Sequence, residues 1–299
     1  MWFQALFLVL TFITIALVSG NNLSACVGPA IGSKTLSKRA GILLGALSFS
    51  LGLVIQGPSM TASFHSLLSN PTLALETEIL LVAILVFVVA DLIRAPISLS
   101  MCLVGLFIGL DVANGGAVKP FTLEIIGMWA VAPVAAIALA FYLTRIIKKR
   151  SKGNIWRRVG ALKLVLILLA FSTSYVLGAN TLGLIVAVGG FNPLSLVSAI
   201  AAIFVGSFFL SSGELKRVSQ ELFLMHYSNA TVTLLTSTLL VELATLFNIP
   251  LSNTQALSAA LFGTAVSYKT KLIFLWPFLI IVVGWIIAPL LGFAAGLLL

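Results

Sequence analysis

Four short polar segments interrupt the apolar stretches of this chain, and they form two matching pairs. Residues 19–24 and 178–183 carry Gly, Asn, Ser and Thr, and each is followed later in its half by a Pro- and Ser-containing segment, at 95–100 and 249–254. Amide and hydroxyl groups can donate hydrogen bonds to an oxyanion or offer oxygen ligands to Na⁺. Polar breaks in membrane helices are where secondary transporters bind substrates and coupling ions. The pattern therefore predicts discontinuous membrane helices around a binding site.

We expect the polar side chains of these segments to form the substrate site. The candidate substrate-binding residues are Asn21, Asn22, Ser24, Ser98, Ser100, Asn180, Thr181, Ser252, Asn253 and Thr254. A half-helix that begins at each break would present free N–H groups and its positive dipole end, which attract an anion. Pro96 and Pro250 suit the first helical turn, where a missing N–H costs nothing. Ordinary capping, and hydroxyls that bond back to their own helix, are the alternative roles.

Acidic residues inside apolar segments are a second class of candidates, because an ionisable residue in a membrane span is a functional hypothesis by default. Asp91 and Arg94 are spaced to form a local ion pair. Glu242 is open to ion coupling or to structural pairing, and Asp111 is expected at the membrane interface. The candidates for ion coupling are Asn21, Asn180, Ser98, Ser252, Glu242 and Asp91.

Enzyme activity has little support in the sequence. His65 and His226 lack metal-ligand spacing, and no nucleotide-binding loop or nucleophile–base pair is recognisable. Cys26 and Cys102 lie in apolar segments and are expected to be buried free thiols. We therefore expect no cofactor, and no metal other than Na⁺ as a coupling ion.

Composition identifies an all-α polytopic membrane protein. Of 299 residues, 60 % are hydrophobic and 8 % are charged, whereas a soluble domain is about 25 % charged. The apolar runs match the length that a helix needs to cross a hydrocarbon core of about 30 Å. The net charge of +9 comes from basic residues in short connections, which favours a role in membrane orientation over nucleic-acid binding.

The apolar segments divide the chain into two halves. The first half, 1–144, contains segments at 3–19, 22–33, 40–57, 77–93, 96–111 and 123–144. A basic loop, 145–159, separates it from the second half, 160–299, with segments at 160–178, 181–190, 193–211, 228–247, 250–266 and 272–298. The start of the chain could be a secretory signal, but residues 1–4 contain no Lys or Arg, which favours a retained first helix.

Basic residues predict the topology. If 22–33 and 181–190 each complete a broken helix, every half crosses the membrane five times. The loop 145–159 is then cytoplasmic, both termini are outside, and Lys119 alone among the 17 basic residues falls outside. An odd number of crossings makes the halves inverted repeats, which can meet at a site near the midplane. A chance recurrence of Gly, Asn and Pro is the alternative interpretation.

Residues 20–33 (GNNLSACVGPAIGS) resemble the Gly-Asn-Asp-x-Ala-Asn-x-x-Gly-Thr-x-Val-Gly-Ser signature of the inorganic phosphate transporter (PiT) family. Residues 178–181 (GANT) resemble its second copy. Residues 96–98 (PIS) and 250–255 (PLSNTQ) resemble the family's Pro-Val-Ser-Thr-Thr-His segments. The resemblance covers both halves and is most specific in the first motif.

The resemblance implies an inverted-repeat symporter that imports phosphate with Na⁺ or H⁺ into the cell, across the cell membrane. Family members also include sulfate permeases. The family's asparagines carry over to Asn21 and Asn180, and its hydroxyl positions carry over to Ser98, Ser252 and Thr254. Its two aspartates do not, since Asn22 and Thr181 stand in their places.

The missing aspartates leave both the substrate and the coupling ion open. Hydrogen phosphate carries an O–H that needs an acceptor, whereas sulfate does not, so a sulfate or broader anion permease is the alternative. An anion channel would need an open pore, and a structural or receptor protein would give no reason for the duplicated breaks. The expected partners are the bilayer, phosphate or sulfate, Na⁺ or H⁺ and, in a homodimer, a second copy of the chain.

Overall fold

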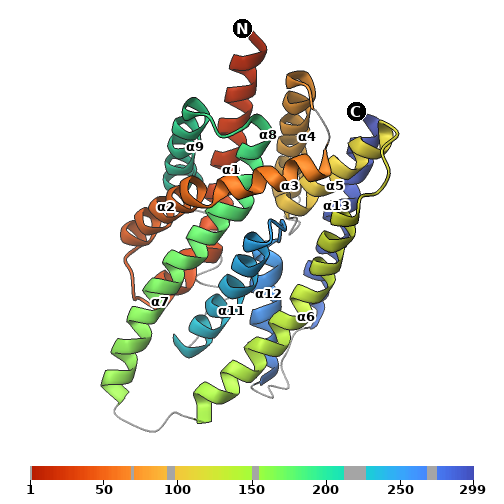
Figure 1. The fold of residues 1–299 in the computed structure, drawn as a ribbon. Helices are drawn as coiled ribbons and strands as arrows, with labels where there is room; N and C mark the ends of the chain where they lie inside the picture. Colours follow the sequence, from red (N-terminus) through yellow and green to blue (C-terminus); the bar gives the residue numbers. More distant parts are fainter. Residues whose placement is uncertain (1, 69–70, 93–97, 150–154, 212–226, 268–274) are drawn as a thin grey trace.

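The computed structural model describes residues 2–68, 71–92, 98–149, 155–211, 227–267 and 275–299, and every regular element within them is helical (Figure 1). The elements of the first half are α1 (Trp2–Gly32), α2 (Lys38–Ile55), η1 (Gly57–Ser59), α3 (Met60–Leu67), α4 (Leu73–Leu92), α5 (Leu99–Ala113) and α6 (Pro120–Lys149). Those of the second half are α7 (Ile155–Leu177), η2 (Gly178–Leu182), α8 (Gly183–Gly189), α9 (Pro193–Val205), η3 (Gly206–Leu210), α11 (Tyr227–Leu246), α12 (Asn253–Ser267) and α13 (Leu275–Leu298).

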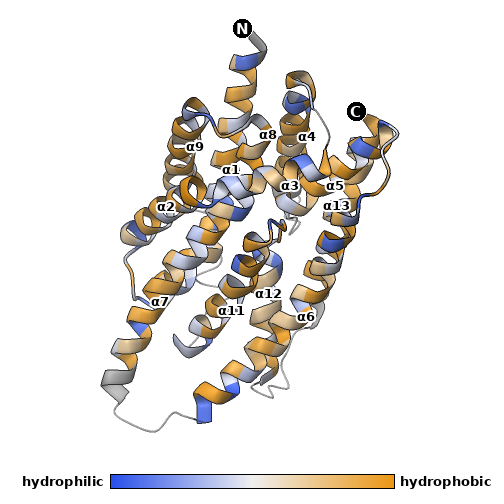
Figure 2. Ribbon diagram, viewed as in Figure 1, coloured by the Kyte–Doolittle hydropathy of each residue, from blue (hydrophilic) through white to orange (hydrophobic). Residues whose placement is uncertain are grey.

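Length and hydropathy confirm a multi-pass membrane protein. Seven helices among the described residues are long and apolar enough to cross a membrane. Hydrophobic residues cover most of their length, and hydrophilic residues gather at helix ends such as the C-terminal end of α6 (Figure 2). The two termini lie at the same end of the molecule, opposite the end of α6 and the start of α7 (Figure 1). α6 continues past Thr144 through Lys149, so the connection between the halves is shorter than predicted.

The predicted break at residues 19–24 is not present, because α1 is one continuous helix of 31 residues. The Asn22 amide donates to the carbonyl of Val18 (2.9 Å), and the Ser24 hydroxyl donates to the carbonyl of Asn21 (3.0 Å). These polar groups are therefore satisfied within the helix, and they do not interrupt it.

The matching segment of the second half distorts its helix without ending it. Residues Gly178–Leu182 form a π-helical turn between α7 and α8, with the N–H of Gly183 bonded to the carbonyls of Gly178 and Asn180. The three elements together form one candidate span, Val159–Gly189. A π turn is a frequent feature of functional sites, since it redirects side chains within a helix.

The second pair of predicted breaks is associated with two short helices. α5 and α12 have 15 residues each, which gives a length of about 22 Å, less than the hydrocarbon core. α12 begins at Asn253, so Pro250 precedes the helix and the prediction that it occupies the first turn was wrong. Pro96 lies outside the described residues, and α5 begins at Leu99 with Ser98 as its N-cap.

The helix contacts within and between the halves occur in matching pairs. α5 packs against α13, and α12 packs against α6. In the same way α1 packs against α9 while α7 packs against α2, and α1 packs against α4 while α7 packs against α11. An inverted repeat predicts such pairs, because a contact between two helices should recur between the corresponding helices of the other half.

Glycine permits the closest of these contacts. Gly52 of α2 faces the carbonyl of Tyr175 in α7, and Gly206, the first residue of η3, faces the carbonyl of Ala16 in α1. At both positions an added Cβ would overlap backbone atoms, which cannot move aside as a flexible side chain can. Backbones can approach this closely only where one helix carries a small residue.

We expect Gly52→Ala to destabilise the protein by about 1–3 kcal/mol, because the new methyl group forces α2 away from α7. Gly127→Ala is the matched control, since a Cβ at Gly127 in α6 meets no atom within 4 Å. The control should be neutral or stabilising by up to about 1 kcal/mol. Thermal unfolding of both variants in the same detergent measures the difference, and equal midpoints would contradict the packing described for α2 and α7.

Candidate functional site

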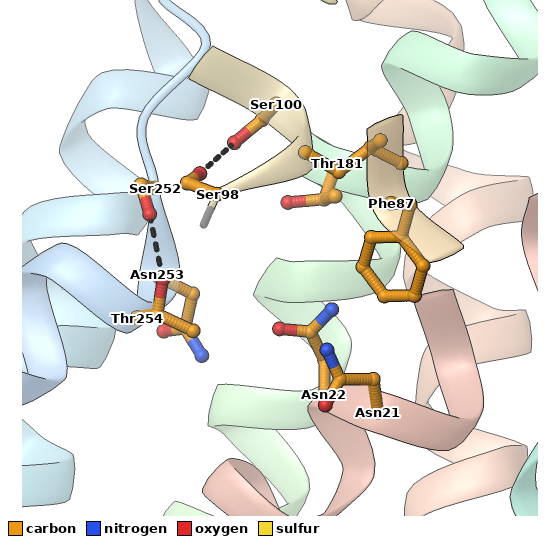
Figure 3. A pocket seen from close by; sticks show the side chains of 10 residues that line it. Asn21, Asn22, Phe87, Ser98, Ser100, Thr181, Ser252, Asn253 and Thr254 are labelled. Atoms are coloured by element: carbon orange, nitrogen blue, oxygen red, sulfur yellow. Dashed lines mark hydrogen bonds between the residues drawn. The ribbon is translucent and has the colours of Figure 1, made fainter. Parts of the chain in front are cut away.

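A cavity of about 30 Å³ lies where the polar segments converge (Figure 3). Its lining comes from five elements of both halves. The lining residues are Asn21 and Asn22 of α1, Phe87 of α4, Ser98, Leu99 and Ser100 at the start of α5, Thr181 of η2, and Ser252, Asn253 and Thr254 at the start of α12. The structure thus brings together every predicted substrate-binding residue except Ser24 and Asn180.

Equivalent positions of the two halves line the cavity together. Asn22 and Thr181 occupy the same position of the first motif, as do Ser98 and Ser252 of the second. Ser100 and Thr254 form a third pair, and each hydroxyl contacts the first serine of its own segment. The cavity therefore lies between corresponding segments of the two halves.

The start of α12 shows how these hydroxyls are positioned. Ser252 caps the helix: its hydroxyl accepts from the N–H of Gln255 (3.2 Å), and its carbonyl accepts from the N–H of Ala256 (3.1 Å). The hydroxyls of Ser252 and Thr254 are 2.9 Å apart, and those of Ser98 and Ser100 are 3.1 Å apart (Figure 3). The first N–H groups of both helices have no partner within the helix. Both helices therefore begin at the cavity.

The cavity lining carries no ionisable group among the residues that the structure describes there. Its polar groups are amides and hydroxyls, which donate and accept hydrogen bonds without bringing a formal charge. The positive ends of the α5 and α12 dipoles are the fixed electrostatic feature beside it. Such a site can hold an anion through hydrogen bonds alone.

Asn180 stabilises the site from outside the cavity. Its side chain is fully buried and donates to the Thr245 hydroxyl (2.9 Å) and the carbonyl of Ile249 (3.0 Å). Its side-chain oxygen accepts from the N–H of Leu251 (3.1 Å). All three bonds go to the end of α11 and the connection to α12, so Asn180 sets the path of the chain that leads into the start of α12.

Trp129 of α6 stabilises the same connection from the other side, and no sequence motif indicated it. Its indole N–H donates to the carbonyl of Pro250 (2.9 Å), and its own carbonyl accepts from the Gln255 amide (3.1 Å). Phe87, which lines the cavity, is the second residue of the site that the motifs did not indicate. Both residues lie in apolar segments, where an aromatic residue usually packs in the hydrophobic core and does not indicate a site.

Glu242 lies away from the cavity and in contact with α2. One carboxylate oxygen accepts from the Gln56 amide (3.0 Å), and the other is buried without a partner among the described residues. Asp91 is in α4, but its side chain and Arg94 fall outside the described part of the chain, so their predicted ion pair stays a prediction. Asp111 pairs with Lys119 (3.3 Å) at the end of α5, and both cysteines are buried and free.

We expect Asn180→Ala to lower the free energy of unfolding by more than about 2 kcal/mol, because it leaves the carbonyl of Ile249 and the N–H of Leu251 buried without partners. Asn21→Ala is the matched control. The Asn21 side chain lines the cavity and makes no hydrogen bond with another described residue, so its removal should change stability by less than about 0.5 kcal/mol. Chemical unfolding in detergent compares the two, and equal losses would contradict the different roles assigned to these asparagines.

Comparisons with known proteins agree with this geometry. The model of the phosphate transporter family matches residues 18–191. A candidate phosphate permease of Methanocaldococcus jannaschii is 24 % identical over 298 residues, which cover 98 % of this chain and 95 % of that protein. A candidate phosphate permease of Helicobacter pylori is 29 % identical over 164 residues, which cover 51 % of this chain and 31 % of that protein.

The fold is that of a solved transporter. A structure described as the sodium-dependent phosphate transporter superposes with a TM-score of 0.85, at 17 % identity, over 100 % of this chain and 98 % of that one. The family model covers more than half of the chain and includes the first signature motif and the π turn. The chain is therefore a multi-pass membrane protein that belongs to the phosphate transporter family.

Proposed function

We propose that this protein imports inorganic phosphate by symport with Na⁺ or H⁺, and that it alternates access around the cavity between α5 and α12. The observation that carries the proposal is the convergence of two helix N-termini and their hydroxyl and amide side chains on one cavity inside the membrane part of the fold. Family membership supports phosphate as the substrate.

The volume of the cavity and its hydrogen-bonding groups suit a small oxyanion. A volume of about 30 Å³ corresponds to about two or three water molecules, so a small ion would enter without its hydration shell. Amide N–H and hydroxyl groups from both halves would replace that shell. Hydrogen bonds to a charged partner contribute about 1.5–3 kcal/mol each, which can offset the loss of water.

Coupling to cations follows from the membrane potential. Moving one charge against 100 mV costs about 2.3 kcal/mol, so a dianion entering a negative interior needs about 4.6 kcal/mol. Two co-transported cations would cancel that charge. In the cell membrane, with the loop 145–159 cytoplasmic and both termini outside, uptake would run toward the basic side of the protein.

Glu242 is the strongest candidate for cation coupling among the described residues. A carboxylate within a membrane-spanning helix is costly unless it serves a function, and one of its oxygens is buried without a partner. Asn21, Asn180, Ser98 and Ser252 were the other described candidates. Of these, Asn180 already accepts a hydrogen bond from the N–H of Leu251 with its side-chain oxygen. That oxygen is therefore less available to a cation than the unpartnered oxygen of Glu242.

Sulfate is the second candidate substrate, and the uncharged lining favours it. Hydrogen phosphate has an O–H that is best accepted by a carboxylate, whereas sulfate needs only donors. With Asn22 and Thr181 in the cavity, a site of this kind discriminates weakly between the two anions. Uptake of labelled phosphate and labelled sulfate into proteoliposomes, with and without a Na⁺ or pH gradient, tests the proposal; no uptake of either anion would overturn it.

Asn22→Asp should restore a carboxylate acceptor to the cavity. We expect it to shift preference toward hydrogen phosphate over sulfate and to strengthen Na⁺ dependence, because a carboxylate is a hard ligand for Na⁺. Competition uptake at two Na⁺ concentrations measures both effects in wild type and variant. A wild type that already requires Na⁺ strictly and ignores sulfate would contradict the argument from charge.

Glu242→Gln should uncouple phosphate uptake from the cation gradient, since it keeps the size of the side chain and the contact with Gln56 but removes the charge. Steady-state accumulation of phosphate in proteoliposomes should fall toward the level reached without a gradient. Gln56→Ala is the control, because it removes the contact and retains the carboxylate. Gradient-driven accumulation by Glu242→Gln equal to that of wild type would rule out Glu242 as the coupling group.

A further inference from the structure

Phe87 gives the candidate site an apolar side. It is the only aromatic residue in the described lining of the cavity, and its side chain is 8 % exposed. Figure 3 shows the ring beside Asn22 and Thr181, across the cavity from Ser252, Asn253 and Thr254. Leu99 is the other apolar lining residue. The ring thus lies against the site, and the polar side chains of Ser252, Asn253 and Thr254 face it from the other side.

The apolar side belongs to the first half alone. Val241 stands as far before Ser252 in the sequence as Phe87 stands before Ser98, yet it is smaller, fully buried and absent from the lining. Leu99 likewise corresponds to the polar Asn253. Three hydrogen-bonding positions are shared between the halves, as the pairs Asn22 and Thr181, Ser98 and Ser252, and Ser100 and Thr254, whereas Phe87 has no lining counterpart. The shared positions already supply hydrogen bonds to the ligand. The difference therefore indicates that Phe87 has a role in selecting the ligand.

A phenyl ring at this place limits what can bind. It offers no N–H or O–H donor, so oxygen atoms of an anion gain nothing by facing it. The organic substituent of a phosphonate or a phosphate monoester would be directed to this side, because the other described lining residues are polar except Leu99. The ring fills the space that such a substituent would need, and closely packed interiors do not widen without cost.

We propose that Phe87 is a specificity-determining residue that restricts the site to inorganic oxyanions and excludes phosphonates and phosphate monoesters. The inference rests on the proposed function, since it assumes that an oxyanion binds in this cavity. It adds the chemical class of ligand that the site rejects and the side chain that rejects it.

The test is inhibition of labelled phosphate uptake by methylphosphonate, whose methyl group takes the place of one oxygen. We expect Phe87→Ala to lower the ratio of the methylphosphonate to the phosphate inhibition constant by about ten- to two-hundredfold, the discrimination that one methyl-sized group supports in an apolar pocket. Phe87→Leu, which retains more of the volume, should give a smaller shift in the same direction and remains informative if the alanine variant does not fold.

Phe107→Leu is the matched control, because Phe107 is fully buried on α5 against Phe64 and does not line the cavity. It should leave the ratio unchanged, whatever it does to stability. A ratio that is unchanged in the folded Phe87 variants, or that shifts equally in Phe107→Leu, would overturn the inference while phosphate uptake by wild type still supports the transport function. Absence of uptake of both phosphate and sulfate by wild type would overturn both.

Discussion

The site depends on one constraint: the backbone between α11 and α12 must find hydrogen-bond partners where lipid offers none. Asn180 satisfies the carbonyl of Ile249 and the N–H of Leu251, and Trp129 satisfies the carbonyl of Pro250. Because these partners come from α6 and from the π turn after α7, the connection is fixed from two sides. The start of α12 can therefore point its first residues into a cavity instead of joining α11 in one long helix.

The same constraint explains why an uncharged site can be built for an anion. Two short helices begin at the cavity, and their first N–H groups have no partner within the helix. Hydroxyls at equivalent positions of the two halves add donors without adding charge. A countercharge buried beside the cavity would need its own partner, whereas helix ends and hydroxyls are held in place by the packing of α5 on α13 and of α12 on α6.

The sequence predicted the helical membrane fold and most of the cavity lining, because apolar length and polar interruptions reflect the bilayer directly. It did not predict that α1 is continuous, since Asn22 and Ser24 bond back to their own helix and leave no break. Nor could it distinguish the roles of Asn21 and Asn180, which occupy the same position of the two motifs. One side chain faces the cavity, and the other faces the α11–α12 connection. Trp129 and Phe87 were not predicted, because aromatic residues that line or support a site within apolar segments do not differ in sequence from other core residues.

In the proposed function, phosphate occupies the cavity between α5 and α12. The most direct measurement is the rate at which a small thiol reagent modifies Leu99→Cys, since Leu99 lines the cavity without donating a side-chain hydrogen bond, and the native cysteines are buried. We expect that phosphate slows this modification, that chloride at equal ionic strength does not, and that the modified protein no longer takes up phosphate. A modification rate that phosphate leaves unchanged, in a variant that still transports it, would contradict the assignment of the site.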